Sequence, residues 1–217
     1  MTDASATTDK PLLRGVSHQI FAVVAVVATA FLVLRAKTPD SRFAAMVFGA
    51  SLTMLLAVSA LYHRVNWGTK GRARMRRVDH AAIFLLIAGG YTPLLWLVPP
   101  TEAGHRVLLF IWIGAAIGVV KSVAWVHAPK WLTALLCLGL GWAGVTDVVE
   151  RMTKLEPIVT PLIVAAGVLY TAGAATYALK RPDPFPKVFG YHEVFHALVV
   201  LASACLFVHV ALLVGTY

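Results

Sequence analysis

Residues 197–215 read ALVVLASACLFVHVALLVG, a run that contains no Lys, Arg, Asp or Glu. With the residues just before it, the apolar stretch covers about 191–215. A helix needs about 20 such residues to cross the hydrocarbon core of a bilayer. The run has no alternation of polar and apolar residues, so a membrane-spanning strand is excluded. This end of the chain therefore predicts a transmembrane helix.

Six more apolar runs of similar length precede it. The seven predicted helices cover about residues 18–35, 43–63, 79–98, 107–127, 131–149, 158–179 and 191–215. Charged residues make up 13% of the chain, against about 25% in soluble domains. We therefore predict an all-α, polytopic membrane protein, with a polar N-terminal tail (1–17) and one seven-helix domain (18–217).

The first run has one alternative explanation. Lys10 and Arg14 precede it, and Ala28-Thr29-Ala30 resembles the cleavage site of a signal peptide. The tripeptide lies inside the apolar run, with FLVL still to follow, so a retained helix is favoured.

The net charge of +9 comes from 19 basic and 10 acidic residues. The cations lie between apolar runs and form no basic face with interleaved aromatic residues, which argues against nucleic-acid binding. With the N-terminus in the cytoplasm, the cytoplasmic segments hold more Lys and Arg than the outer ones. The positive-inside rule thus predicts a cytoplasmic N-terminus and an outer C-terminus.

Polar residues gather near the predicted cytoplasmic ends of three helices. Ser59 and His63 end the second helix, Asp79 opens the third, and His192 and His196 open the seventh. The predicted topology places all five at one membrane level. Ionisable residues at membrane depth are candidates for function.

These residue types suit a zinc site in a multi-pass protein of the cell membrane, near its cytoplasmic side. His192 and His196 are one helical turn apart, and His63 would supply a third imidazole. The fourth position would be left to water, with Asp79 placed to orient that water and take its proton. Ser59 would orient a ligand or hold the water. A single histidine at a helix end is more often an interfacial polar residue, and Asp79 could simply cap the third helix.

Other polar residues allow different explanations. Residues 192–196, HEVFH, match the HExxH motif of zinc metalloproteases, with Glu193 as base. The third ligand is missing downstream, because His209 lies about 20 Å along the helix from His196. We expect Glu193 to be a carboxylate near Lys187. His18 would be an interfacial residue or line the mouth of the site.

Two cysteines lie within the apolar runs, and five glycines lie within the fifth and sixth of these runs. Cys137 and Cys205 lie inside apolar runs and are predicted to be small buried hydrophobes. Glycines in the fifth and sixth helices favour close packing, and the sequence leaves open whether they form a homodimer. They are Gly139, Gly141, Gly144, Gly167 and Gly173.

Three motifs resemble the hemolysin III proteins, within the progestin and adiponectin receptor (PAQR) superfamily. They are SALYH at 59–63, DHAAIFLLIAGGYTP at 79–93 and GYHEVFH at 190–196. The resemblance covers about residues 14–215. The first family motif is incomplete, because LLRGVSH at 12–18 has its Ser and His but not its Glu and Asn.

The resemblance implies seven helices, a cytoplasmic N-terminus and a zinc ion held by His63, His192 and His196, with Asp79 and Ser59 beside it. Receptor members are linked to ceramide hydrolysis, alkaline ceramidases belong to the wider superfamily, and bacterial members are linked to cytolysis and lipid homeostasis. The long extra-membrane domain of the receptors is missing, which argues against a hormone receptor.

Three functions follow as hypotheses. The first is a zinc-dependent hydrolase of a membrane lipid amide or ester, similar to a ceramidase. The second is a non-enzymatic sensor or regulator of membrane lipids with a structural zinc, although structural sites are normally closed by protein ligands. The third is a pore-forming cytolysin, for which the helices lack the continuous polar stripe of a water-filled path.

Overall fold

The computed structural model describes residues 10–98, 101–125, 127–155 and 160–217, and all elements named within these ranges are helices. They are α1 (Val16–Arg35), α2 (Pro39–Arg64), α3 (Thr69–Trp96), α4 (Glu102–Ala124), α5 (Lys130–Ala143), α6 (Val145–Leu155), α7 (Thr160–Leu179) and α8 (Tyr191–Thr216). Seven spans in the described residues are long and apolar enough to cross a membrane, one of them formed by α5 and α6 together. The predicted fold class is confirmed.

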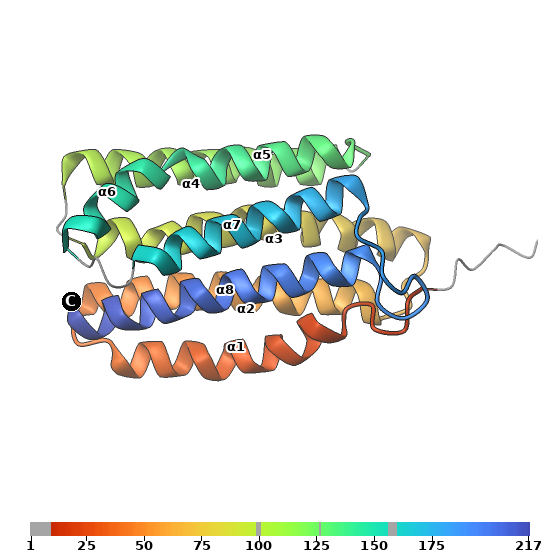
Figure 1. Ribbon diagram of the computed structural model, residues 1–217, viewed down its shortest axis with the longest axis horizontal. Helices are drawn as coiled ribbons and strands as arrows, with labels where there is room; N and C mark the ends of the chain where they lie inside the picture. The colour runs from red at the N-terminus through yellow and green to blue at the C-terminus, as the bar shows by residue number, and fades with distance from the viewer. Residues whose placement is uncertain (1–9, 99–100, 126, 156–159) are drawn as a thin grey trace, which may run out of the picture.

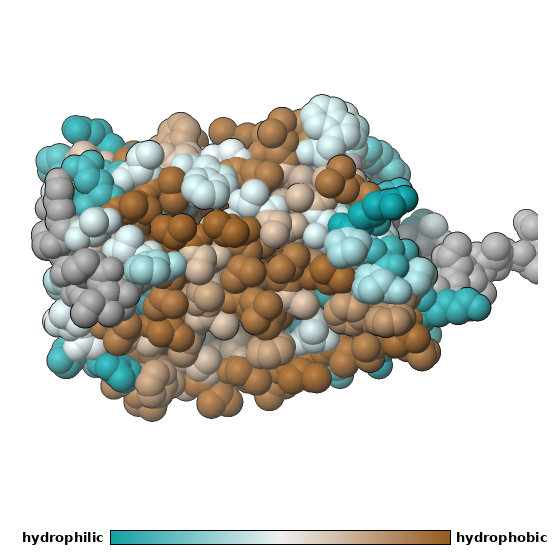
Figure 2. Space-filling model, viewed as in Figure 1, coloured by the Kyte–Doolittle hydropathy of each residue, from teal (hydrophilic) through white to brown (hydrophobic). Residues whose placement is uncertain are grey.

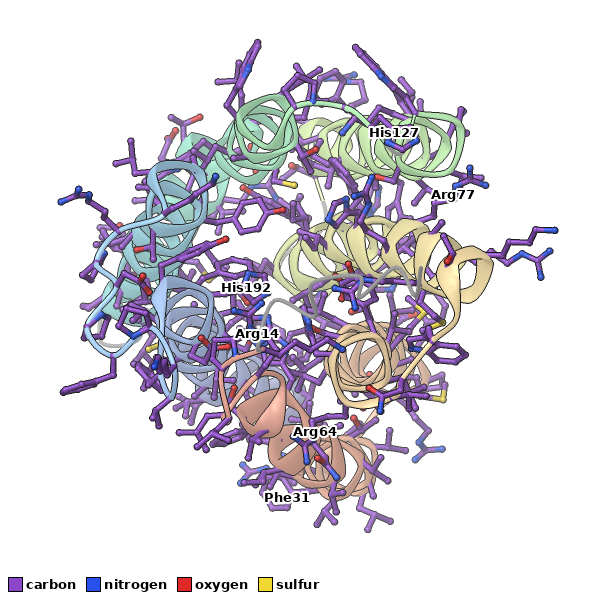
Figure 3. The ribbon with its side chains drawn as sticks, turned by 90° about the vertical axis from the view of Figure 1, so that its right-hand side faces the viewer. Arg14, Phe31, Arg64, Arg77, His127 and His192 are labelled. Carbon is purple, nitrogen blue, oxygen red and sulfur yellow. The ribbon has the colours of Figure 1, made fainter. Side chains whose placement is uncertain are left out.

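The helices run side by side along the long axis of the molecule (Figure 1). Viewed from one end, α2, α3, α5, α7 and α8 surround a central space, with α1 outside against α2 and α8 (Figure 3). We call the end where α1 and α8 begin and α2 ends the histidine end. All the predicted site residues lie toward it.

The surface matches a bilayer environment. In Figure 2, hydrophobic side chains form a broad band across the visible face, and hydrophilic side chains gather at both ends. Large apolar side chains such as Val23, Ile117 and Val168 are more than half exposed. An apolar surface of this extent is unfavourable in water and favourable against lipid.

Several helices begin a few residues before their predicted bounds, and the third and fifth differ most. The third begins at Thr69, not near residue 79, because the Lys, Arg and Met residues before Asp79 are good helix formers although they are not apolar. The fifth apolar run is divided at Gly144, which ends α5, while α6 begins at Val145. Glycine is costly within a helix, which favours a break at this position. The predicted start of the sixth run, at 158, lies outside the described residues.

Glycines allow close helix packing, at Gly144 among the predicted positions and at several positions that were not predicted. A Cβ atom on Gly118 of α4 would lie 2.2 Å from the Phe84 ring of α3, and one on Gly49 would lie 2.3 Å from Thr29. Gly139 and Gly141, in contrast, have nothing within 4 Å of a Cβ position. Tight contacts therefore join α1 with α2 and α3 with α4. They also join α2 with α3, where a Cβ atom on Gly89 would lie 2.1 Å from Ser51, and a Cβ atom on Gly144 would lie 2.8 Å from the Tyr91 ring of α3.

We expect Gly118→Ala to lower the melting temperature of the purified protein. The added methyl group would collide with the buried Phe84 ring, and overpacking of this kind costs about 1–3 kcal/mol. Gly139→Ala is the matched control, since it adds the same group to open space. Thermal unfolding in detergent distinguishes the two, and equal melting temperatures would contradict the tight α3–α4 contact.

Candidate metal centre

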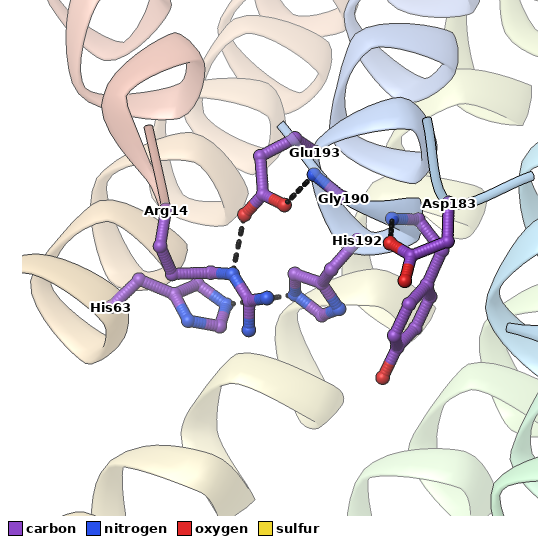
Figure 4. A network of polar contacts seen from close by, with 7 residues as sticks. Arg14, His63, Asp183, Gly190, His192 and Glu193 are labelled. Atoms are coloured by element: carbon purple, nitrogen blue, oxygen red, sulfur yellow. Dashed lines mark hydrogen bonds and ion pairs between the residues drawn. The ribbon is translucent and has the colours of Figure 1, made fainter. Parts of the chain in front are cut away.

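Three imidazoles converge where α2 ends and α8 begins. His63 lies in the last turn of α2, and His192 and His196 lie in the first two turns of α8. The Nε2 atoms of His63 and His192 are 3.1 Å apart (Figure 4). One nitrogen from each of the three rings lies within 4.8 Å of the others. The structure thus brings the three predicted ligands together.

The arrangement fits a metal ion. Two nitrogen ligands of a tetrahedral metal, each about 2.0–2.1 Å from it, lie about 3.3 Å apart, close to the His63–His192 separation. The Nδ1 atom of His196 is buried without a hydrogen-bond partner among the described residues. A buried nitrogen without a partner is costly, and metal coordination through this nitrogen would remove that cost. The three imidazoles could therefore hold a metal.

Asp79 and Ser59 stand beside this cluster. The Ser59 hydroxyl of α2 hydrogen-bonds to the Asp79 carboxylate of α3. Both side chains line the same cavity as the three histidines. Among the described residues, the possible ligand atoms that lie within 4.8 Å of one another come from the three imidazoles. Asp79 is not a member of this group. Asp79 does not cap α3, because the helix begins ten residues earlier.

His18 is buried and lines the site cavity, which agrees with the second of its two predicted placements and not with an interfacial one. It is 2% exposed, and its ring stacks on His196 with centroids 3.8 Å apart and an angle of 9° between the planes. Its position in the first turn of α1 brings a fourth imidazole against the cluster. The His18 ring therefore covers the face of the His196 ring that is turned toward α1 and restricts the orientation of that ring.

Glu193 does not point toward the metal cluster. Its carboxylate, 3% exposed, accepts hydrogen bonds from Arg14 and, at 2.8 Å, from the backbone N–H of Gly190 (Figure 4). It thus accepts a hydrogen bond from a backbone N–H group at the N-terminus of α8 and, through Arg14, holds the segment before α1 against that helix. The ion pair is with Arg14, while Lys187, near which Glu193 was predicted to lie, accepts a hydrogen bond from the backbone N–H of Leu12 through its backbone carbonyl at 3.0 Å. Since this carboxylate is engaged away from the cluster, the geometry argues against a metalloprotease base.

A cavity of about 550 Å³ extends from the cluster into the bundle. At the histidine end it is lined by the site residues. Farther in, its walls are largely apolar and come from α3, α5, α7 and α8, with Leu86, Leu138, Ile163 and Leu206 among them. The cluster therefore lies where a polar end of the cavity meets an apolar interior.

The rings of Tyr62 and Tyr177 lie against the cluster, although neither residue was among the predicted site residues. The Tyr177 ring of α7 lies 5.8 Å from the His192 ring, and the Tyr62 ring lies 4.6 Å from that of His63. Tyr62 lies inside the SALYH motif, between Ser59 and His63, and this position could have identified it as a site residue. Tyr177 lies in an apolar run of α7 and nothing in that run marks it.

Comparisons with known proteins agree with this architecture. The model of a family described as "Haemolysin-III related" matches residues 6–207. The chain is 28% identical to the "Hemolysin-3 homolog" of Bacillus subtilis (strain 168), over 93% of this chain and 92% of that protein. It is 24% identical to the human "Monocyte to macrophage differentiation factor", over 87% and 77% of the two chains. It is also 25% identical to the "Adiponectin receptor protein" of Drosophila melanogaster, over 76% of this chain and 41% of the receptor.

We expect Glu193→Gln to destabilise the protein while its metal content is unchanged. The substitution removes the buried negative charge that pairs with Arg14, and charge-assisted hydrogen bonds contribute about 1.5–3 kcal/mol. Glu102→Gln, in the exposed first turn of α4, is the control. Melting temperature and metal content are measured together. Loss of metal from a Glu193→Gln protein that remains folded would contradict the structural role of Glu193.

Proposed function

Since the chain belongs to the Haemolysin-III related family of multi-pass membrane proteins, within the PAQR superfamily, we propose that it is a zinc-dependent hydrolase of a membrane lipid amide or ester. One observation carries the proposal. The His63–His192–His196 cluster and the Ser59–Asp79 pair share the polar end of a cavity with an apolar interior. This arrangement supplies a metal site, a base and a place for an acyl chain.

Zinc is the metal that the donor set supports best. Three histidine nitrogens with an open fourth position are typical of catalytic zinc sites. Imidazole also suits zinc better than it suits calcium or magnesium, which prefer oxygen ligands. When bound, zinc would activate water and polarise the carbonyl of the scissile bond.

Asp79 is the general base in this proposal. Its carboxylate would take a proton from the attacking water and return it to the departing amine or alcohol, so that the proton count balances. The hydrogen bond from Ser59 holds the carboxylate in one orientation beside the imidazoles. The surrounding helices limit the access of bulk water to this step.

The apolar interior would hold the acyl chain of the substrate. Side chains such as Leu138, Ile163 and Leu206 offer no hydrogen bonds, so an alkyl chain is the chemistry that they match. We also propose that the histidine end faces the cytoplasm, since the cation-rich segments adjoin it.

A second function has one observation in its favour. The three imidazoles join the end of α2 to the start of α8. A metal bound there would fasten two helices, and a non-enzymatic regulator of membrane lipids would need only this effect.

We expect the protein purified without chelators to contain about one zinc per chain. The variants His63→Ala and His196→Ala are expected to lose it, because each removes one of three ligands from a shared site. His105→Ala, an exposed histidine in the first turn of α4, is the control that should retain zinc. Elemental mass spectrometry measures the content. Wild-type protein without stoichiometric metal would refute both the site and the hydrolase.

We expect Asp79→Asn to retain zinc but to lose hydrolysis by about 10²–10⁴-fold, the usual contribution of a general base. The assay follows fatty-acid release from lipid amides and esters, ceramide included, with protein in nanodiscs. Lys70→Gln, an exposed residue in the first turn of α3, is the matched control. Full zinc loading without hydrolysis of any lipid in the wild type would favour the regulator instead.

A further inference from the structure

Four cationic side chains line the polar end of the cavity. They are Lys10 and Arg14, from the segment before α1, and Arg72 and Arg76, from the first turns of α3. Lys10 and Arg72 are exposed and therefore lie where the cavity opens. Of the described residues that line the cavity, Asp79 alone is acidic. We call these four residues the cationic mouth.

The positive charges of the cationic mouth are close enough to influence one another. The pKa of Lys10 is lowered from its ordinary value, first by partial burial and then by the charges of Arg72 and Arg14. Arg14 is paired with Glu193, and Arg72 lies 5.7 Å above the ring of Tyr62. The mouth therefore holds an excess of positive charge that an anion would relieve.

Membrane orientation does not explain why these cations face the cavity. The positive-inside rule requires basic residues at one end of the bundle, on any side of a helix. Lys70, Arg74 and Arg77 satisfy it from α3 without lining the cavity. In Figure 3, Arg14 lies toward the middle of the bundle and Arg77 lies on the outer side.

Instead, the arginines continue the cavity face of α3. Arg72, Arg76, Asp79, Ile83 and Ile87 recur at intervals of three and four residues and all line the cavity. Such residues share one face of a helix. At 1.5 Å per residue, Arg76 lies about 4.5 Å and Arg72 about 10 Å along the axis from Asp79. Moving inward, the face presents two guanidinium groups, the site carboxylate and then an apolar wall.

We propose that the cationic mouth binds the head group of an anionic phospholipid, whose ester carbonyl then reaches the histidine cluster while its acyl chain fills the apolar interior. Arginine favours phosphate because its planar donors can bind two oxygens at once. A zwitterionic head group would bring a cationic amine into a region that is already positive. The catalytic part of this inference rests on the proposed function, but head-group binding does not.

The test is lipid retention, measured by native mass spectrometry of the purified protein. Phosphatidylglycerol, phosphatidylcholine and ceramide of equal chain length are the probes. We expect wild-type protein to retain phosphatidylglycerol in preference to the other two lipids. We expect the double variant Arg72→Gln/Arg76→Gln to retain at least about tenfold less phosphatidylglycerol than the wild type. Lys70→Gln/Arg74→Gln removes the same charge outside the cavity and should leave retention unchanged. The single variant Lys10→Gln, at an exposed position, should show a partial loss and covers the case in which the double arginine variant fails to fold.

Four results would overturn the inference. The first is an equal loss in the two double variants, which would indicate a general charge effect. The second is equal retention of ceramide or phosphatidylcholine by the wild type. The third is complete displacement of phosphatidylglycerol by a modest excess of inorganic phosphate, which would indicate a site for free phosphate. Hydrolysis of ceramide without any preference for phosphatidylglycerol would overturn this inference and leave the proposed function standing.

Discussion

Polar groups inside a membrane must find partners within the protein, and this constraint determines the histidine end of the bundle. Three imidazoles, the Ser59–Asp79 pair and the Arg14–Glu193 pair all lie within or beside apolar helices. The imidazoles join α2 to α8, the Ser59–Asp79 pair joins α2 to α3, and the Arg14–Glu193 pair joins the segment before α1 to α8. The histidine cluster, the cavity opening and the anchoring of α1 therefore all depend on these segments meeting at one level.

The architecture and the core of the site could be predicted from the sequence because both depend on local periodicity. The apolar run of α8 predicted its helix within one residue at either end. The spacing of His192 and His196 predicted both on one helix face, and the predicted topology put His63 at the same membrane level. Whether a metal binds there is a chemical question that the positions alone do not answer.

The remaining details depend on contacts between distant residues, which a single sequence does not encode in any spacing. Arg14 and Glu193 are 179 residues apart, and their pairing decides that Glu193 faces away from the metal cluster. The burial of His18 requires that α1 pack against α8 with its first turn beside His196. The start of α3 was misplaced because hydropathy marks where a helix enters lipid, whereas helix propensity marks where the helix begins.

The residues of α3 that precede Asp79 matter for the site because they are helical. If the helix began at Asp79, the cations before it would lie in a loop and have no fixed face. Because α3 begins at Thr69, the helix face that lines the cavity continues without a break from Asp79 to Arg76 and Arg72. The helix therefore fixes the distances of both arginines from the Asp79 carboxylate. One helix face thus orders a cationic opening, the Asp79 carboxylate and an apolar chamber along the length of the bundle. A lipid has the same order of parts along its own length: head group, scissile bond and chain.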